Sequence, residues 1–69
     1  MAKKKAQPYN RIREVLAEKG MTQAELADLL DVRFPTINRF CNGHREPTLD
    51  MLYRIAKVLK VSARELIRE

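Results

Sequence analysis

The chain has 69 residues, enough for one small domain and too few to enclose a sizeable substrate cavity. Its 14 Lys and Arg outnumber 9 Asp and Glu, and the net charge of +5 favours polyanionic partners. The single cysteine, Cys41, excludes an intrachain disulfide and a cysteine-based zinc site, and no apolar run approaches the roughly 18–20 residues that span a bilayer.

Apolar residues recur at intervals of three and four, and no segment alternates as a strand would, so an all-α fold is predicted. Two capping boxes indicate helix starts: Thr22 is followed by Glu25, and Ser62 is followed by Glu65. An apolar residue stands on each side of both motifs, as in a hydrophobic staple. Gly20 and Gly43 are natural stops for the helices that precede them.

In chain order, residues 1–8 are expected to form a flexible basic arm and residues 9–69 the folded domain. Five helices are predicted, with these approximate bounds: Tyr9 or Asn10 to Lys19, Gln23 to Leu30, Phe34 to Asn42, Leu49 to Leu59, and Ala63 to Arg68. Thr48 is predicted to cap the fourth helix. One apolar face of each helix should form the core, with Leu49 and Leu66 included and Ile67 a further candidate.

The connection between the second and third helices, Leu29 to Arg33, is too short for antiparallel packing, so these helices should cross at a steep angle. A helix-turn-helix of about twenty residues is therefore predicted over Gln23–Asn42. The segment from Val32 to Arg45 carries three arginines, one histidine and no acid, which concentrates positive charge there. The predicted architecture is a compact five-helix bundle that contains this motif.

These motifs together resemble the helix-turn-helix domain of Cro and the phage repressors, often called the XRE family. The resemblance spans about Asn10–Ile67 and rests on Met21–Ala27, Val32, Thr36–Phe40, Asn42-Gly43, Pro47–Leu49 and Ile55–Lys57. It implies a lambda-repressor-like DNA-binding domain. Asp31 stands where the family usually has a turn glycine, which predicts a small local cost. Arg33 stands where a Ser or Thr cap is usual, so the third helix is expected to fray without DNA.

The resemblance implies that the third helix presents its first half to base edges in the major groove. The matching positions are Arg33, Phe34, Pro35, Asn38 and Arg39. Arg39 is the first choice for direct readout, because arginine can donate two hydrogen bonds to guanine. The alternative for Arg33 and Arg39 is a solvated charge on a helix surface.

Phosphate contacts are expected from residues that flank the third helix: Gln23, Thr36, Asn42, Gly43, His44 and Arg45. Gln23 matches the backbone-contacting glutamine of the family, at the positive end of the second helix. His44 could instead be an exposed turn residue without a role. Lys3, Lys4 and Lys5 could follow the DNA as an arm, or simply form a solvated tail.

Met51, Tyr53, Val58 and Ile67 are more apolar than the core needs and form a candidate homodimer surface. A two-fold dimer would place two reading helices about 34 Å apart on a pseudo-palindromic operator. No catalytic group, metal site, cofactor, membrane contact or small-molecule effector is indicated. We expect a cytoplasmic transcriptional regulator of duplex DNA, a repressor or small controller protein. The alternatives are an antitoxin, disfavoured because no neutralising segment follows Glu69, or one domain of a larger regulator.

Overall fold

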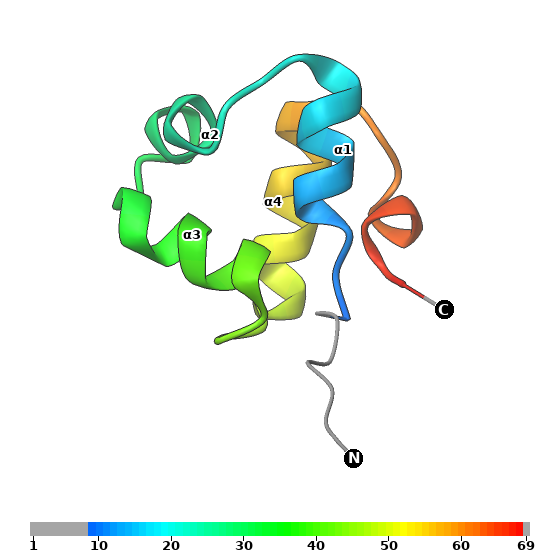
Figure 1. Ribbon diagram of the computed structural model, residues 1–69. Helices are drawn as coiled ribbons and strands as arrows, with labels where there is room; N and C mark the ends of the chain where they lie inside the picture. The colour runs from blue at the N-terminus through cyan, green and yellow to red at the C-terminus, as the bar shows by residue number, and fades with distance from the viewer. Residues whose placement is uncertain (1–8, 69) are drawn as a thin grey trace.

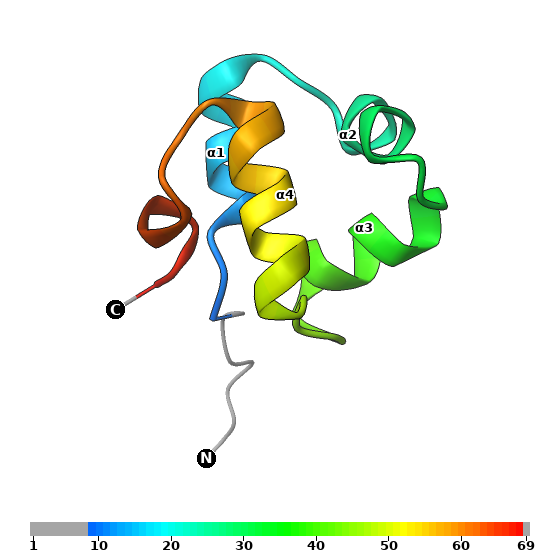
Figure 2. The same ribbon diagram turned by 180° about the vertical axis from the view of Figure 1, so that it is seen from behind.

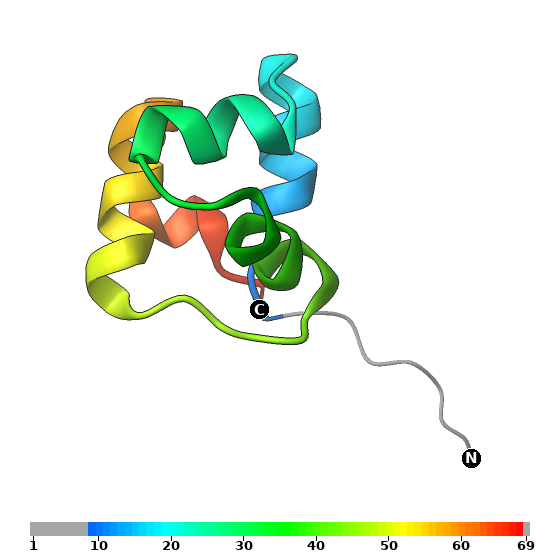
Figure 3. The ribbon, with the colours of Figure 1, turned by 90° about the vertical axis from the view of Figure 1, so that its left-hand side faces the viewer.

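The computed structural model describes residues 9–68, in which four α-helices and one 3-10 turn surround an apolar core (Figure 1). The bounds are α1 Ile12–Lys19, α2 Gln23–Leu30, α3 Phe34–Asn42, α4 Leu49–Leu59 and the 3-10 turn η1 Ala63–Leu66. In Figure 3, α1 and α4 stand on opposite sides, with α2 across the top and α3 between them. The arm predicted for residues 1–8 lies outside the described residues.

Side-chain caps fix two helix starts where the sequence predicts them. At α2, Thr22 Oγ1 accepts the N–H of Glu25 at 3.0 Å, and Glu25 Oε1 accepts the N–H of Thr22 at 2.8 Å. At α4, Thr48 Oγ1 accepts the N–H of Met51 at 3.1 Å. By contrast, α3 begins after Arg33, whose side chain offers no acceptor to the first-turn N–H groups.

All four α-helices end in one and the same way, with a left-handed residue followed by a backward hydrogen bond. The left-handed residues are Gly20, Asp31, Gly43 and Lys60, with φ angles of 67°, 59°, 79° and 61°. In each case the next N–H donates at 3.0 Å to a carbonyl five residues earlier. This is the Schellman arrangement, which satisfies carbonyls that the helix leaves free. Asp31, which stands where the family usually has a turn glycine, therefore adopts the conformation that glycine favours.

The prediction of a fifth α-helix is wrong. Only the four residues of η1 are helical, and Ile67 then turns extended, with φ −110° and ψ 130°. Ile67 pairs with Asn10 in an antiparallel bridge, which the hydrogen bond from Arg68 N to Tyr9 O extends at 2.6 Å. Pairing with the N-terminal segment therefore stops the helix that the capping box at Ser62 begins.

The same pairing delays the start of α1. Arg11 N donates to Leu66 O at 2.7 Å, and the side-chain Oδ1 of Asn10 accepts the N–H of Ile12 at 3.1 Å. Residues 9–11 are thus held outside the helix, which begins at Ile12 and not at Tyr9 or Asn10.

The core follows the predicted helix faces with one clear exception. Ile12, Leu26, Ile37, Ile55 and Leu66 are fully buried at its centre. Leu49, predicted as core, is 65% exposed because it is the first residue of α4 and lies a full turn before Leu52, at the edge of the core. Cys41 is buried as expected, and burial raises the pKa of its thiol.

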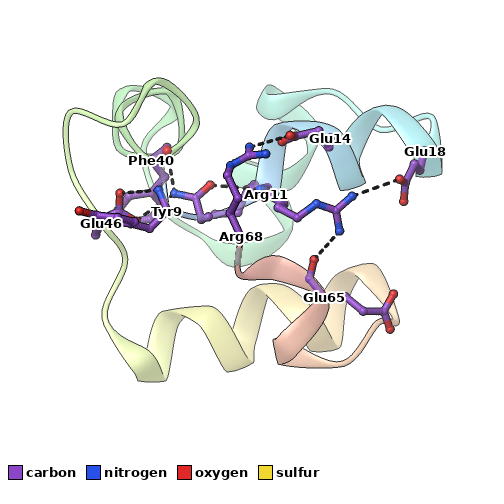
Figure 4. Close-up of polar contacts among 10 residues, drawn as sticks. Tyr9, Arg11, Glu14, Glu18, Phe40, Glu46, Glu65 and Arg68 are labelled. Carbon is purple, nitrogen blue, oxygen red and sulfur yellow. Dashed lines mark hydrogen bonds and ion pairs between the residues drawn. The ribbon is translucent and has the colours of Figure 1, made fainter. Parts of the chain in front are cut away.

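A polar network joins the N-terminal segment to the rest of the fold (Figure 4). Asn10 is 3% exposed, and its Nδ2 donates to Phe40 O at 2.9 Å and to Glu46 Oε1 at 3.2 Å. On the same side of the molecule, Arg68 pairs with Glu14 at 2.6 Å. The Asn10 contacts fasten the segment before α1 to the end of α3 and to the loop that follows it, and the Arg68–Glu14 pair fastens α1 to the C-terminal segment.

Candidate nucleic-acid interface

The helix-turn-helix is held together by packing between α2 and α3 and by a hydrogen bond from α4. The steep crossing of α2 and α3 is confirmed, since Figure 3 looks along α3 while α2 runs across the view. Ala27 is buried, and its small side chain lets the two helices approach. From α4, the Arg54 guanidinium donates to Leu30 O at 3.0 Å and so holds the end of α2.

The two faces of α3 differ sharply in burial. Ile37, Phe40 and Cys41 point into the core. Pro35 and Arg39 are exposed, and their spacing of four residues puts them on one side of the helix, opposite the buried residues. Of the other candidate base contacts, Arg33 and Phe34 are exposed and Asn38 is half-buried. The third helix therefore presents a surface on which Arg39 stands outward.

Three of the predicted contact residues are joined by hydrogen bonds. Asn38 Nδ2 donates to Gln23 Oε1 at 3.0 Å, and Asn42 Nδ2 donates to Asn38 Oδ1 at 3.0 Å. The guanidinium of Arg13, on α1, donates to Asn42 Oδ1. Arg13 could not be predicted from the sequence, because 29 residues separate it from Asn42 and no local pattern connects them.

The loop after α3 carries Gly43, His44 and Arg45, all exposed. The backbone N–H groups of His44 and Arg45 donate to Arg39 O at 3.0 and 3.3 Å, which curls the loop back over the helix end. Thr36, also a predicted backbone contact, is half-buried on α3.

Glu46 anchors this loop to the N-terminal segment. Its carboxylate accepts Tyr9 N at 3.3 Å as well as Asn10 Nδ2. Residue 9, the first that the structure describes, therefore lies against the loop that follows α3. The contact between Asn10 and Glu46 could not be predicted from the sequence, because the two residues are 36 positions apart. Lys3, Lys4 and Lys5 lie outside the described residues.

The candidate dimer residues divide into two kinds. Tyr53 and Ile67 are exposed, at 62% and 45%. Met51 and Val58 are half-buried and pack against the core, so part of their apolar area already serves this fold. Leu49 adds an exposed apolar side chain at the start of α4, which stands in front in Figure 2.

Within residues 9–68, no group of three or more His, Cys, Asp or Glu side chains is placed to hold a metal ion. None of the helices in this range is long and apolar enough to cross a membrane.

Comparisons with known proteins agree with this geometry. The helix-turn-helix family model matches residues 12–66. An uncharacterised HTH-type transcriptional regulator from Archaeoglobus fulgidus is 43% identical over 56 residues, which cover 81% of this chain and 80% of that protein. The crystal structure of a candidate DNA-binding protein from Bacteroides fragilis superposes with a TM-score of 0.84 at 44% identity, covering 86% of this chain and 95% of the other. The chain therefore belongs to the helix-turn-helix family of DNA-binding regulators, as its resemblance to Cro and the phage repressors predicted.

Proposed function

We propose that this protein is a transcriptional regulator that reads duplex DNA with α3 in the major groove. One observation supports this proposal most strongly: Arg39 is exposed on the side of α3 opposite its buried residues. The helix is held in place by packing against α2, whose end is in turn bonded to Arg54 of α4. No acid interrupts the segment from Val32 to Arg45, so this surface attracts the phosphate backbone. As a regulator, the protein would act in the cytoplasm, at the nucleoid.

Base readout is assigned to Arg33, Phe34, Pro35, Asn38 and Arg39. Arg39 would donate two hydrogen bonds to one guanine, a pairing that discriminates between bases by roughly 1–3 kcal/mol. Phe34, 48% exposed, offers an aromatic face to a thymine methyl group. Asn38 already donates one amide hydrogen to Gln23, so its second hydrogen is the group available to a base.

Backbone contacts are assigned to Gln23, Thr36, Asn42, Gly43, His44 and Arg45. Gln23 opens α2, where the helix dipole and the first-turn N–H groups that Thr22 does not cap favour a phosphate. The hydrogen bond from Tyr9 N to Glu46 places residue 9, which follows the predicted arm, beside the loop that carries His44 and Arg45. This position supports a role for Lys3, Lys4 and Lys5 along the same phosphates.

We further propose a homodimer on a pseudo-palindromic operator, with the protein acting as a repressor or small controller. The exposed side chains of Tyr53 and Ile67 supply apolar surface, and Met51 and Val58 are partly exposed on α4. Two-fold pairing would place the two α3 helices about one helical turn of DNA apart. Sedimentation in the presence of operator tests this, and a single copy per operator at every concentration would contradict the dimer.

Selection of bound duplexes from a random pool tests the function as a whole, because it reports bases, symmetry and spacing together. With the selected operator, Arg39→Ala should abolish the preference at one base position in each half-site. Arg45→Ala should instead weaken binding to all sequences alike and reduce the salt slope by about one unit. An equal loss of affinity across every base variant on Arg39→Ala would remove Arg39 from direct readout.

A further inference from the structure

Four side chains from three helices form a hydrogen-bonded series that runs from α2 along α3 to α1. In order they are Gln23 at the start of α2, Asn38 and Asn42 on α3, and Arg13 on α1. Both carboxamides on α3 donate toward α2 and accept from the side of α1. The series therefore has a fixed direction and ends on a guanidinium.

Arg13 keeps its full positive charge in this arrangement. The two ion pairs found among residues 9–68 join Arg11 to Glu18 and Arg68 to Glu14, and neither includes Arg13. Its partner, Asn42, is a neutral amide, which orients the guanidinium without cancelling its charge. An arginine has five N–H donors, so several remain for an anion after one goes to Asn42.

The middle of the series has less to offer a ligand. Asn38 and Asn42 each commit one amide hydrogen and accept a hydrogen bond at the carbonyl within the protein. The residues at the two ends of the series keep free donors. Gln23 accepts from Asn38 at its Oε1, so its amide nitrogen, on the other branch, points away from Asn38. Two donors, one on each flank of α3, are thus held at the ends of one series.

We propose that Arg13 binds a backbone phosphate of the DNA, and that Asn42 and Asn38 are positioning residues that orient Arg13 and Gln23 on the two flanks of α3. This inference rests on the proposed function. It adds α1 to the contact surface, and it replaces the direct backbone contact assigned to Asn42 above with the role of positioning Arg13. The guanidinium is held in its binding geometry before DNA arrives, so less side-chain entropy is lost on binding.

The test compares Arg13→Gln with Lys19→Gln, which removes one positive charge from the exposed last turn of the same helix. Binding to the selected operator and to unrelated duplexes is measured as a function of salt. Arg13→Gln should weaken binding to all sequences by about tenfold and reduce the salt slope by about one unit. Lys19→Gln should change affinity by less than about twofold, since an exposed charge outside the hydrogen-bonded series is screened.

Asn42→Ala tests the positioning role, because it leaves the charge of Arg13 in place. It should weaken binding by about threefold with the salt slope unchanged, and should add almost nothing in combination with Arg13→Gln. Arg13→Lys, which retains the charge without the planar fork, should likewise retain the slope. Circular dichroism melting without DNA checks that each variant is folded.

The outcomes separate the two ideas. If the wild-type protein binds duplexes but Arg13→Gln matches Lys19→Gln, the phosphate contact is wrong and the proposed function stands. If the losses from Arg13→Gln and Asn42→Ala simply add, Asn42 does not act through Arg13. If the wild-type chain selects no duplex and shows no salt-dependent binding, the proposed function and this inference fall together.

Discussion

Lys60 and Asp31 hold the left-handed conformation that Gly20 and Gly43 hold at the other two helix ends. A side chain with a β-carbon pays roughly 1–2 kcal/mol in this conformation, and aspartate tolerates it better than lysine. Lys60→Gly should therefore raise the free energy of unfolding by about 1 kcal/mol, and Asp31→Gly by less. Urea unfolding measures both differences.

Gly20→Ala provides the opposite control. A β-carbon at Gly20 would meet nothing within 4 Å, so only the backbone strain of its φ of 67° would act. This variant should lower the free energy of unfolding by about 1 kcal/mol. A Lys60→Gly protein that unfolds at lower urea than the wild type would show that contacts of the lysine side chain outweigh the strain.

Single residues could be predicted where spacing along one helix decides their position. Ile37 and Phe40 are apolar and turn one face of α3 into the core, so Pro35 and Arg39 on the opposite face are exposed. That pattern is visible in the sequence alone. Nothing in the sequence around Asn10 indicates that it is buried and that its Nδ2 donates to Phe40 O, 30 residues away. Arg13 is the same kind of case. Both depend on how α1 meets α3, which no local pattern reports.

At the scale of the element, α3 is the helix with the weakest start. Arg33 stands at its N-cap in an extended conformation, and Pro35 helps only by lacking an N–H that would have no partner. Arg33→Ser supplies a side-chain acceptor and should raise the free energy of unfolding by about 1 kcal/mol. If Arg33 also contacts DNA, the same variant should bind the operator more weakly. Urea unfolding and operator titration of one protein sample measure both effects.

Arg33→Ala serves as the matched variant, since it removes the guanidinium without adding a cap. Both variants should lose a similar amount of affinity, while only Arg33→Ser gains stability. A gain in operator affinity for Arg33→Ser would mean that ordering of α3 matters more than the charge of Arg33. That result would remove Arg33 from the proposed contact surface.

Helix starts and stops could be predicted because they are local. The capping box at Thr22, the cap at Thr48 and the glycine stops each lie within a few residues of the element they bound. The C-terminal segment shows the limit of such signals. Its capping box at Ser62 predicts a helix, but pairing of Ile67 with Asn10 takes the chain into an extended conformation after one turn. The competing interaction comes from the other end of the chain.

At the scale of the whole molecule, Glu14 and Arg68 link α1 to the C-terminal segment. Burial raises the pKa of Glu14, but the hydrogen bond from Arg68, a backbone hydrogen bond, and the charges of Arg68 and Arg11 together outweigh it and leave the pKa below its ordinary value. A carboxyl group whose pKa is lower in the folded state stabilises above its unfolded pKa. That contribution is lost as the pH falls through the folded pKa.

Arg68→Gln should therefore lower the free energy of unfolding at about pH 7. It should also lose less of that free energy than the wild type when the pH falls from about 7 to about 3. The effect should stay below about 1 kcal/mol, because the pair is partly exposed and screened by solvent. Urea unfolding at the two pH values measures it, with Arg64→Gln in η1 as the matched loss of charge. Equal acid sensitivity in the wild type and Arg68→Gln would show that Glu14 does not contribute.

The bridge between Asn10 and Ile67 sets the two ends of the folded segment at the same edge of the domain. A protein fused before Tyr9 and one fused after Arg68 would therefore emerge within reach of each other. A pair of fluorescent reporters attached in this way would report on the closure of the fold itself. On the proposed DNA complex, the attachment before Tyr9 would begin beside the loop after α3, so a bulky fusion there should hinder binding to DNA.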